Sequence, residues 1–297
     1  AEHRYTIVLL AAKLGQATER HLSVSAVVDS RERFDKVDQE RTEWPLEQLR
    51  VPHPDLAVPL LPSAHAARLY QRVMTSHPRF DSGKGGWRAV PWAEFHVTND
   101  RKNGLLKEPG TVAGEVWPVY GGKSFDLWEP EAWKQDGELG FVLEPAIGLA
   151  ELDRKRLRSD VWRAHFLPDV LRDPRTMPHH RPRILFRDIT NRTNSRTSIA
   201  CLVPPKVFAH NKAPSLLWPM GDERDQAYLL GVMSSVPFDW FARRRVELNM
   251  NYFILNSLPV PRPPRDDPRW ARAVELAGRL GSIDERYSGF AAAVGVT

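Results

Sequence analysis

The chain has 297 residues, 42% of them hydrophobic and 27% charged, a balance typical of a globular protein large enough for two domains. No apolar run approaches the roughly 20 residues that span a bilayer, and the single cysteine, Cys201, excludes an internal disulfide. We therefore expect a cytoplasmic protein without membrane partners. Because the sequence opens with Ala-Glu-His and no initiator methionine, we also expect it to be part of a longer protein.

Positive charge is concentrated in the middle of the chain. The formal net charge is only +5, but residues 151–200 carry 12 Lys or Arg against 6 Asp or Glu. A basic stripe on a near-neutral body is typical of a surface that contacts phosphates. A solvated face with nearby acids fits the composition equally well.

The N-terminal part is predicted to be an α/β region. The patterns predict strands at residues 5–12 and 22–28, paired with each other, and helices at 46–50 and 64–74. Trp44 and Pro45 predict a turn before the first helix, and Ser63 predicts an N-cap for the second. The apolar face of that second helix carries Ala67, Tyr70 and Val73 or Met74.

A loop at residues 77–86, rich in proline, serine and glycine, predicts a domain boundary. The patterns after it predict a strand at 87–97 that ends in Thr98-Asn99-Asp100, a charged helix at 151–158, and an apolar segment at 161–170 with Trp162 and Phe166 four residues apart. Residues 117–128, WPVYGGKSFDLW, predict a tight hairpin with a packed aromatic lid, and a ligand loop is the alternative.

Residues 183–203 have the plainest pattern in the chain: strand, polar turn, strand. The tip carries Asn191, Thr193, Asn194 and Ser195, and Arg187, Arg192 and Arg196 flank it. We therefore expect a polar, cationic hairpin tip.

The C-terminal part centres on residues 238–264. A helix is predicted at 225–236, ended by Pro237, and an aromatic strip, three arginines and an asparagine-spaced apolar run follow. The prolines at 259–264 exclude a helix or a central strand and predict the end of a domain. Asp267 and Pro268 then start a last helix, whose predicted buried face is Trp270, Val274, Ala277 and Leu280.

Common enzyme motifs are missing from the sequence. Gly122-Lys123-Ser124 fails as a phosphate loop because Trp117 stands where the motif needs its first glycine. His179 and His180 lie in a loop rich in proline and arginine and are predicted to be surface residues rather than metal ligands. Asp153-Arg-Lys155 has the spacing of a metal-dependent nuclease but lacks a suitable upstream aspartate, so nuclease is the weakest hypothesis.

The clustered Arg, Asn and Thr residues favour recognition of DNA. Arginine reads guanine and asparagine reads adenine by paired hydrogen bonds in the major groove, while Lys, Ser and Thr hold phosphates. The alternative is that Asn and Thr in turns bond their own backbone.

A family resemblance rests on several blocks read together: HRYTIVLL, EFHVTND, WPVYGGKSFDLW, LFRDITNRTNSRTSIACLVPP and FDWFARRRVELNMNYFILNSLPVPRPP. Their order and spacing resemble the C-terminal target-recognition region of type IIG-like adenine-specific DNA methyltransferases, found in restriction-modification and phage-defence systems. The chain departs from that family at Tyr120-Gly121-Gly122-Lys123 and at Glu247-Leu248-Asn249-Met250-Asn251. The second departure leaves open whether Asn249 or Asn251 is the structural match.

The resemblance implies sequence-specific recognition of double-stranded DNA, with S-adenosyl-L-methionine bound by a methyltransferase domain or subunit outside this chain. The family's Asn/Asp-Pro-Pro-Tyr/Phe motif is absent, so no catalytic or metal-binding residue is predicted. The expected fold is α+β. It comprises an N-terminal α/β region at 1–85, a target-recognition domain at 86–264 and a C-terminal helical extension at 265–297.

The predicted DNA contacts are Lys123, Arg187, Asn191, Arg192, Thr193, Asn194, Arg196, Arg243, Arg244, Arg245, Asn249 and Asn251. The main rival is a protein-interaction scaffold, in which the aromatic blocks bind a partner subunit and the arginines face solvent.

Overall fold

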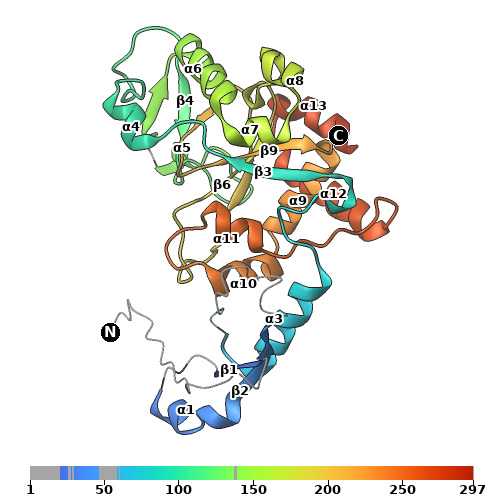
Figure 1. Cartoon of the computed structure of the whole chain (residues 1–297). Helices are drawn as coiled ribbons and strands as arrows, with labels where there is room; N and C mark the ends of the chain where they lie inside the picture. Colours follow the sequence, from blue (N-terminus) through green and yellow to red (C-terminus); the bar gives the residue numbers. More distant parts are fainter. Residues whose placement is uncertain are drawn as a thin grey trace.

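The computed structural model describes residues 21–25, 28, 30–46, 59, 61–136 and 139–296. It confirms an α+β fold, in which short strands form small sheets that helices cover (Figure 1). The predicted strand at 5–12 lies outside the described residues. Among the helices of the described residues, none is long and apolar enough to cross a membrane.

The N-terminal part forms a two-stranded antiparallel hairpin. Its elements are β1 (His21–Ser25), α1 (Arg31–Asp35), η1 (Val37–Glu40), β2 (Arg41–Pro45) and α3 (Ala64–Ser76). The turn predicted at Trp44 and Pro45 is wrong, because both residues belong to β2 and the Trp44 side chain is buried. The prediction for α3 is confirmed: Ser63 Oγ accepts a hydrogen bond from Ala66 N at 3.1 Å, and Tyr70 is buried.

A four-stranded antiparallel sheet forms the centre of the molecule, in the order β3-β9-β6-β7. Its strands are β3 (Arg88–Trp92), β6 (Arg183–Phe186), β7 (Ala200–Val203) and β9 (Ser215–Met220). The predicted hairpin is confirmed, since Arg183 pairs with Val203 and Phe186 with Ala200. The strand predicted to reach residue 100 is wrong beyond Trp92: His96 accepts a hydrogen bond from Asn99 N and caps helix α4 (Val97–Lys102).

A three-stranded sheet, β5-β4-β8, lies beside the first and is covered by short helices (Figure 1). The elements of this part are β4 (Trp117–Tyr120), α5 (Trp133–Asp136), β5 (Phe141–Leu143), α6 (Pro145–Arg158), α7 (Asp160–His165), α8 (Pro168–Arg172), η3 (Pro174–Thr176), η4 (Pro178–His180) and β8 (Phe208–Ala209). The short helix η2 (Lys84–Gly86) precedes β3. The segment 117–128 does not form the predicted hairpin on its own: β4 pairs with β5 and β8.

Helices dominate the C-terminal part. They are α9 (Glu223–Met233), α10 (Val236–Arg245), α11 (Tyr252–Ser257), α12 (Pro268–Gly281), η5 (Glu285–Tyr287) and α13 (Ser288–Val294). The prediction that Pro237 ends a helix is wrong. Pro237 lies in the first turn of α10, where the backbone N–H that proline lacks would have no partner within the helix. Asp267 caps α12 as predicted, but Leu280 is 50% exposed and Gly281 takes its place in the buried face.

The largest hydrophobic cluster crosses both predicted domain boundaries. It contains Tyr70 from α3, Phe186 from β6, Leu229 from α9 and Trp270 from α12. The proline segment at 259–264 is therefore a connection that returns the chain to the same core. The ranges 1–85, 86–264 and 265–297 do not correspond to separate hydrophobic cores.

Candidate nucleic-acid interface

Two segments that carry predicted DNA contacts lie against each other in the structure. We call residues 187–199 the tip loop and residues 243–251 the exit segment. Thr190 N donates to Leu248 O at 3.1 Å, and Met250 N donates to Asp188 O at 2.8 Å. These bonds flank an antiparallel bridge between Ile189 and Asn249. The backbone therefore fixes the tip loop against the exit segment.

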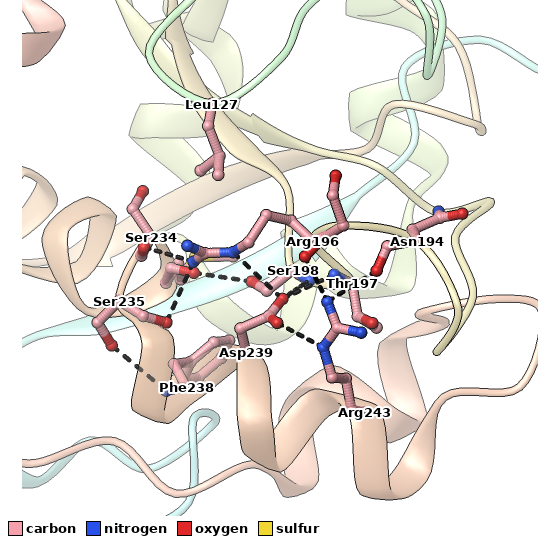
Figure 2. A network of polar contacts seen from close by, with 12 residues as sticks. Leu127, Asn194, Arg196, Thr197, Ser198, Ser234, Ser235, Phe238, Asp239 and Arg243 are labelled. Carbon is pink, nitrogen blue, oxygen red and sulfur yellow. Dashed lines mark hydrogen bonds and ion pairs between the residues drawn. The ribbon is translucent and has the colours of Figure 1, made fainter.

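Arg243 closes the other end of this junction. Its guanidinium donates to Asp239 Oδ2 at 2.7 Å and to Asn194 O of the tip loop at 2.8 Å (Figure 2). It also donates to two further carbonyl oxygens of the tip loop, Arg192 O at 2.8 Å and Ser195 O at 2.5 Å. Carbonyl groups that are partly shielded from solvent need protein donors, and arginine supplies several in a fixed fork. Arg243 thus shapes the tip loop from inside.

Asp239 anchors the returning limb of the tip loop to α10. Its Oδ1 accepts from Thr197 N and Ser198 N, both at 2.7 Å, and lies 3.5 Å from Arg196 Nε (Figure 2). Arg196 Nη2 also donates to Ser234 O at 2.5 Å. Because Asp239 is only 5% exposed, its charge acts on these groups with little screening by solvent.

The amides of the tip loop bond their own backbone, as the alternative interpretation proposed. Asn191 Oδ1 accepts from Thr193 N at 2.8 Å, Thr193 Oγ1 at 2.6 Å and Asn194 N at 3.0 Å. Asn194 Nδ2 donates to Thr190 Oγ1 at 3.3 Å. Asn191 and Asn194 therefore hold the loop conformation, while Thr193 remains exposed at its apex.

The two asparagines of the exit segment have different surroundings. Asn251 caps α11, since its Oδ1 accepts from Ile254 N at 2.9 Å. Asn249 Nδ2 instead donates to Asp188 Oδ2 at 3.0 Å, and Lys212 Nζ lies 3.1 Å from the same oxygen. Asn251 is thus a helix cap, and Asn249 is held across the junction between the two segments.

Lys123 lies on a glycine turn, residues 121–126, beside the start of the tip loop. Arg187 Nη2 donates to Phe125 O at 2.6 Å and lies 3.7 Å from Asp126 Oδ2. A Cβ at Gly122 would lie 3.1 Å from Arg187 Cγ, so a glycine lets the turn approach this arginine. Burial lowers the pKa of Arg187, whereas the Lys123 side chain is exposed.

The remaining predicted arginines lie on or near α10. The Arg244 guanidinium lies 5.1 Å from the centre of the Trp240 ring, a cation–π distance, and burial, with Arg243 and Arg192 nearby, lowers its pKa. Arg192, Arg244 and Arg245 are all half-buried. With Lys123 they complete the set of predicted cations around the tip loop and α10.

The sequence reasoning missed Asp188, Lys212 and Asp239, which organise this junction. Asp239 stands four residues before Arg243 in α10, and this spacing indicates an ion pair on one helix face. That signal was present in the sequence. The role of Asp188 depends on tertiary contacts and has no local signature.

Two other sequence candidates have structural partners. Lys155 Nζ lies 2.7 Å from Asp100 Oδ2, and Asp153 Oδ1 accepts from Arg156 at 2.7 Å. The prediction that His179 is a surface residue is wrong: it is 3% exposed, and burial lowers its pKa to about 3. Among the described residues, no group of three or more His, Cys, Asp and Glu side chains could hold a metal ion.

No family model and no curated protein matches this chain. The function is therefore inferred from the sequence and from the geometry of the junction.

Proposed function

We propose that this chain recognises a specific double-stranded DNA sequence as the specificity region of an adenine-specific DNA methyltransferase of a restriction-modification or phage-defence system. Catalysis and S-adenosyl-L-methionine binding belong to a methyltransferase domain or subunit outside the described residues. One observation carries the proposal: the tip loop and the exit segment, which are both rich in arginine and asparagine, are joined to each other by backbone hydrogen bonds.

The geometry supports two different roles among the predicted DNA contacts. Arg187, Arg196 and Arg243 donate to backbone carbonyl groups, so their main role is to give the surface its shape. Lys123 is exposed beside the tip loop, and Arg192, Arg244 and Arg245 add positive charge on the tip loop and on α10. A rigid polar loop flanked by cations suits a duplex, because phosphate contacts set the register while groups on the loop meet base edges.

The scaffold alternative requires the aromatic blocks to be accessible to a partner. Tyr120 and Phe125 are both 0% exposed, and Phe238 and Phe241 are 3% and 6% exposed. These four rings form part of the core and are not accessible to a partner, whereas Phe253 of the last block is 51% exposed.

The salt dependence of duplex binding tests the proposal. We expect the affinity of the whole chain for duplex DNA to fall steeply with salt, with a log–log slope near −0.9 for each phosphate neutralised. The Lys123→Ala variant should reduce the magnitude of this slope by about one. Lys84→Ala, which changes an exposed lysine in the loop before β3, is the matched control and should leave the slope unchanged. An affinity that does not respond to salt would contradict DNA recognition.

A further inference from the structure

The amide of Asn249 is held in one orientation by its neighbours. Its Nδ2 lies 3.0 Å from Asp188 Oδ2, and Asp188 is itself paired with Lys212 at 3.1 Å. Because an ionised carboxylate only accepts hydrogen bonds, it must face the amide nitrogen and not the amide oxygen. Asp188 uses one N–H of Asn249 and leaves the amide oxygen and the second N–H for another partner.

Ile189 stands beside Asn249 on the same side of the junction. The hydrogen bonds of this bridge join Thr190 to Leu248 and Met250 to Asp188, so Ile189 and Asn249 form a non-hydrogen-bonded antiparallel pair. Side chains of such a pair lie close together on one face. Ile189 is 55% exposed although it is a large apolar residue. An oriented amide and an exposed branched side chain therefore share one face.

This pair matches the major-groove edge of an A·T base pair. Adenine presents the N7 acceptor and the N6 amino donor, which one amide oxygen and one N–H can engage together, and thymine presents a methyl group. A guanine would place its O6 acceptor against the amide oxygen. The paired contact to adenine uses the N–H on the same side of the amide as its oxygen, so it requires Asp188 to hold the other N–H of Asn249.

We propose that Asn249 reads adenine in an A·T base pair of the recognised sequence, that Ile189 contacts the thymine methyl group, and that Asp188 is a positioning residue for the Asn249 amide. The inference rests on the proposed function and adds to it the identity of one base. It also assigns different roles to the two asparagines of the exit segment, since the Asn251 amide oxygen already caps α11.

Selection of duplexes from a randomised library by the whole chain gives the first test. The wild-type chain should show an adenine preference at one position, and Asn249→Ala should lose it by roughly 5- to 150-fold. Asp188→Ala should weaken the preference at that same position while leaving the salt dependence of binding unchanged. Asn103→Ala, which changes an exposed asparagine next to α4, is the matched control and should keep the wild-type preference.

Base analogues at the selected position give the second test. Replacing adenine by 7-deazaadenine removes N7 and should weaken binding by the wild type but not by Asn249→Ala. Replacing the paired thymine by deoxyuridine removes one methyl group and should weaken wild-type binding about fourfold, and Ile189→Ala should abolish that difference.

The outcomes separate the inference from the function on which it rests. If the wild-type chain binds no duplex, or binds without dependence on salt, both are overturned. If it binds with the expected salt dependence and Asn249→Ala keeps every base preference, only the assignment of Asn249 is overturned. Loss of the adenine preference with Asn251→Ser instead of Asn249→Ala would also overturn it.

Discussion

Two buried carboxylates of this protein each bind arginine, but they join different parts of the fold. Glu94 Oε1 accepts from Arg183 at 2.7 and 3.0 Å, and its Oε2 accepts from Ala209 N at 2.8 Å. This pair links the end of β3 to β6 and β8, and so connects the two larger sheets. Asp239 links α10 to the tip loop, whose apex is exposed.

The comparison shows that an ion pair between a buried carboxylate and arginine can stabilise either the core or a surface loop. Glu94 and Arg183 have side chains that are 1% and 3% exposed, so each depends on the other for compensation of its charge. The two arginines paired with Asp239, Arg196 and Arg243, are about a quarter exposed and donate to loop carbonyls. The first pair fixes the body of the protein, and the second fixes the shape of the candidate interface.

Removal of one partner of the core pair should give the largest effect on stability. Glu94→Ala leaves Arg183 buried without its partner, and we expect the free energy of unfolding to fall by about 3 to 5 kcal/mol. Urea denaturation of the purified chain measures this change. The double variant Glu94→Leu with Arg183→Met removes both charges and is the control. It still leaves the Ala209 amide without its acceptor, so we expect it to lose stability, but less than Glu94→Ala does. A loss below about 1 kcal/mol in Glu94→Ala would contradict the importance of this pair.

Compared with Glu94→Ala, Asp239→Ala should lower the free energy of unfolding less and should weaken DNA binding more. It leaves the amides of Thr197 and Ser198 without their acceptor, which costs about 1 to 3 kcal/mol. Because the tip loop loses its anchor, duplex affinity measured under conditions where the variant is folded should also fall. Asp239→Asn keeps an acceptor oxygen and should retain more of both properties. Full duplex affinity in Asp239→Ala would show that the loop does not need this anchor.

The sequence predicted the local structure of each segment of the interface better than the contacts between the segments. The β6–β7 hairpin follows from two apolar strands with a polar turn, and the Asn191 turn follows from the tendency of asparagine to bond its own backbone. The contact between the tip loop and the exit segment joins residues far apart in the sequence, such as Ile189 and Asn249. No local pattern reports such a pairing, so only the structure could show it.

The proline segment at residues 259–264 does not separate two hydrophobic cores. Proline breaks helices and strands, and residues 259–264 indeed lie outside regular secondary structure. A break in secondary structure does not end a hydrophobic core, however, because the chain can return to the same core. Trp270 of α12 packs against Tyr228 of α9, with their ring centres 6.1 Å apart. The buried face of α12 was predictable from its helical period, but the surface that it covers was not.

The core region also contains a pH-sensitive group, His179. Its pKa is lowered to about 3, chiefly by burial and then by the charges of His180 and Arg183, whereas an unfolded chain has a histidine pKa of about 6.5. The contribution of His179 to stability is therefore complete above about pH 6.5 and is lost as the pH falls toward the folded-state value. The slope should reach about 1.4 kcal/mol per pH unit.

His179→Leu tests this contribution by removing the titrating group. Urea denaturation between about pH 6 and pH 4 should show a shallower loss of stability than in the wild type. His65→Leu is the matched control, since it removes an exposed histidine of α3. If His179→Leu and the wild type lose stability in parallel, the buried histidine is not a source of acid sensitivity.

The smallest effect is expected at Asn251, where it separates a structural role from a recognition role within the interface. Asn251→Ala removes the N-cap of α11, and we expect a loss of about 1 kcal/mol in the free energy of unfolding. Serine is an equally good N-cap, so Asn251→Ser should restore the stability measured by urea denaturation. Because the amide oxygen already accepts from Ile254 N, Asn251→Ser should also bind the same DNA sequences as the wild type. If Asn251→Ser keeps the wild-type stability but binds a different DNA sequence, then Asn251 reads a base. In that case the residue would have both roles, as the N-cap of α11 and as a base contact.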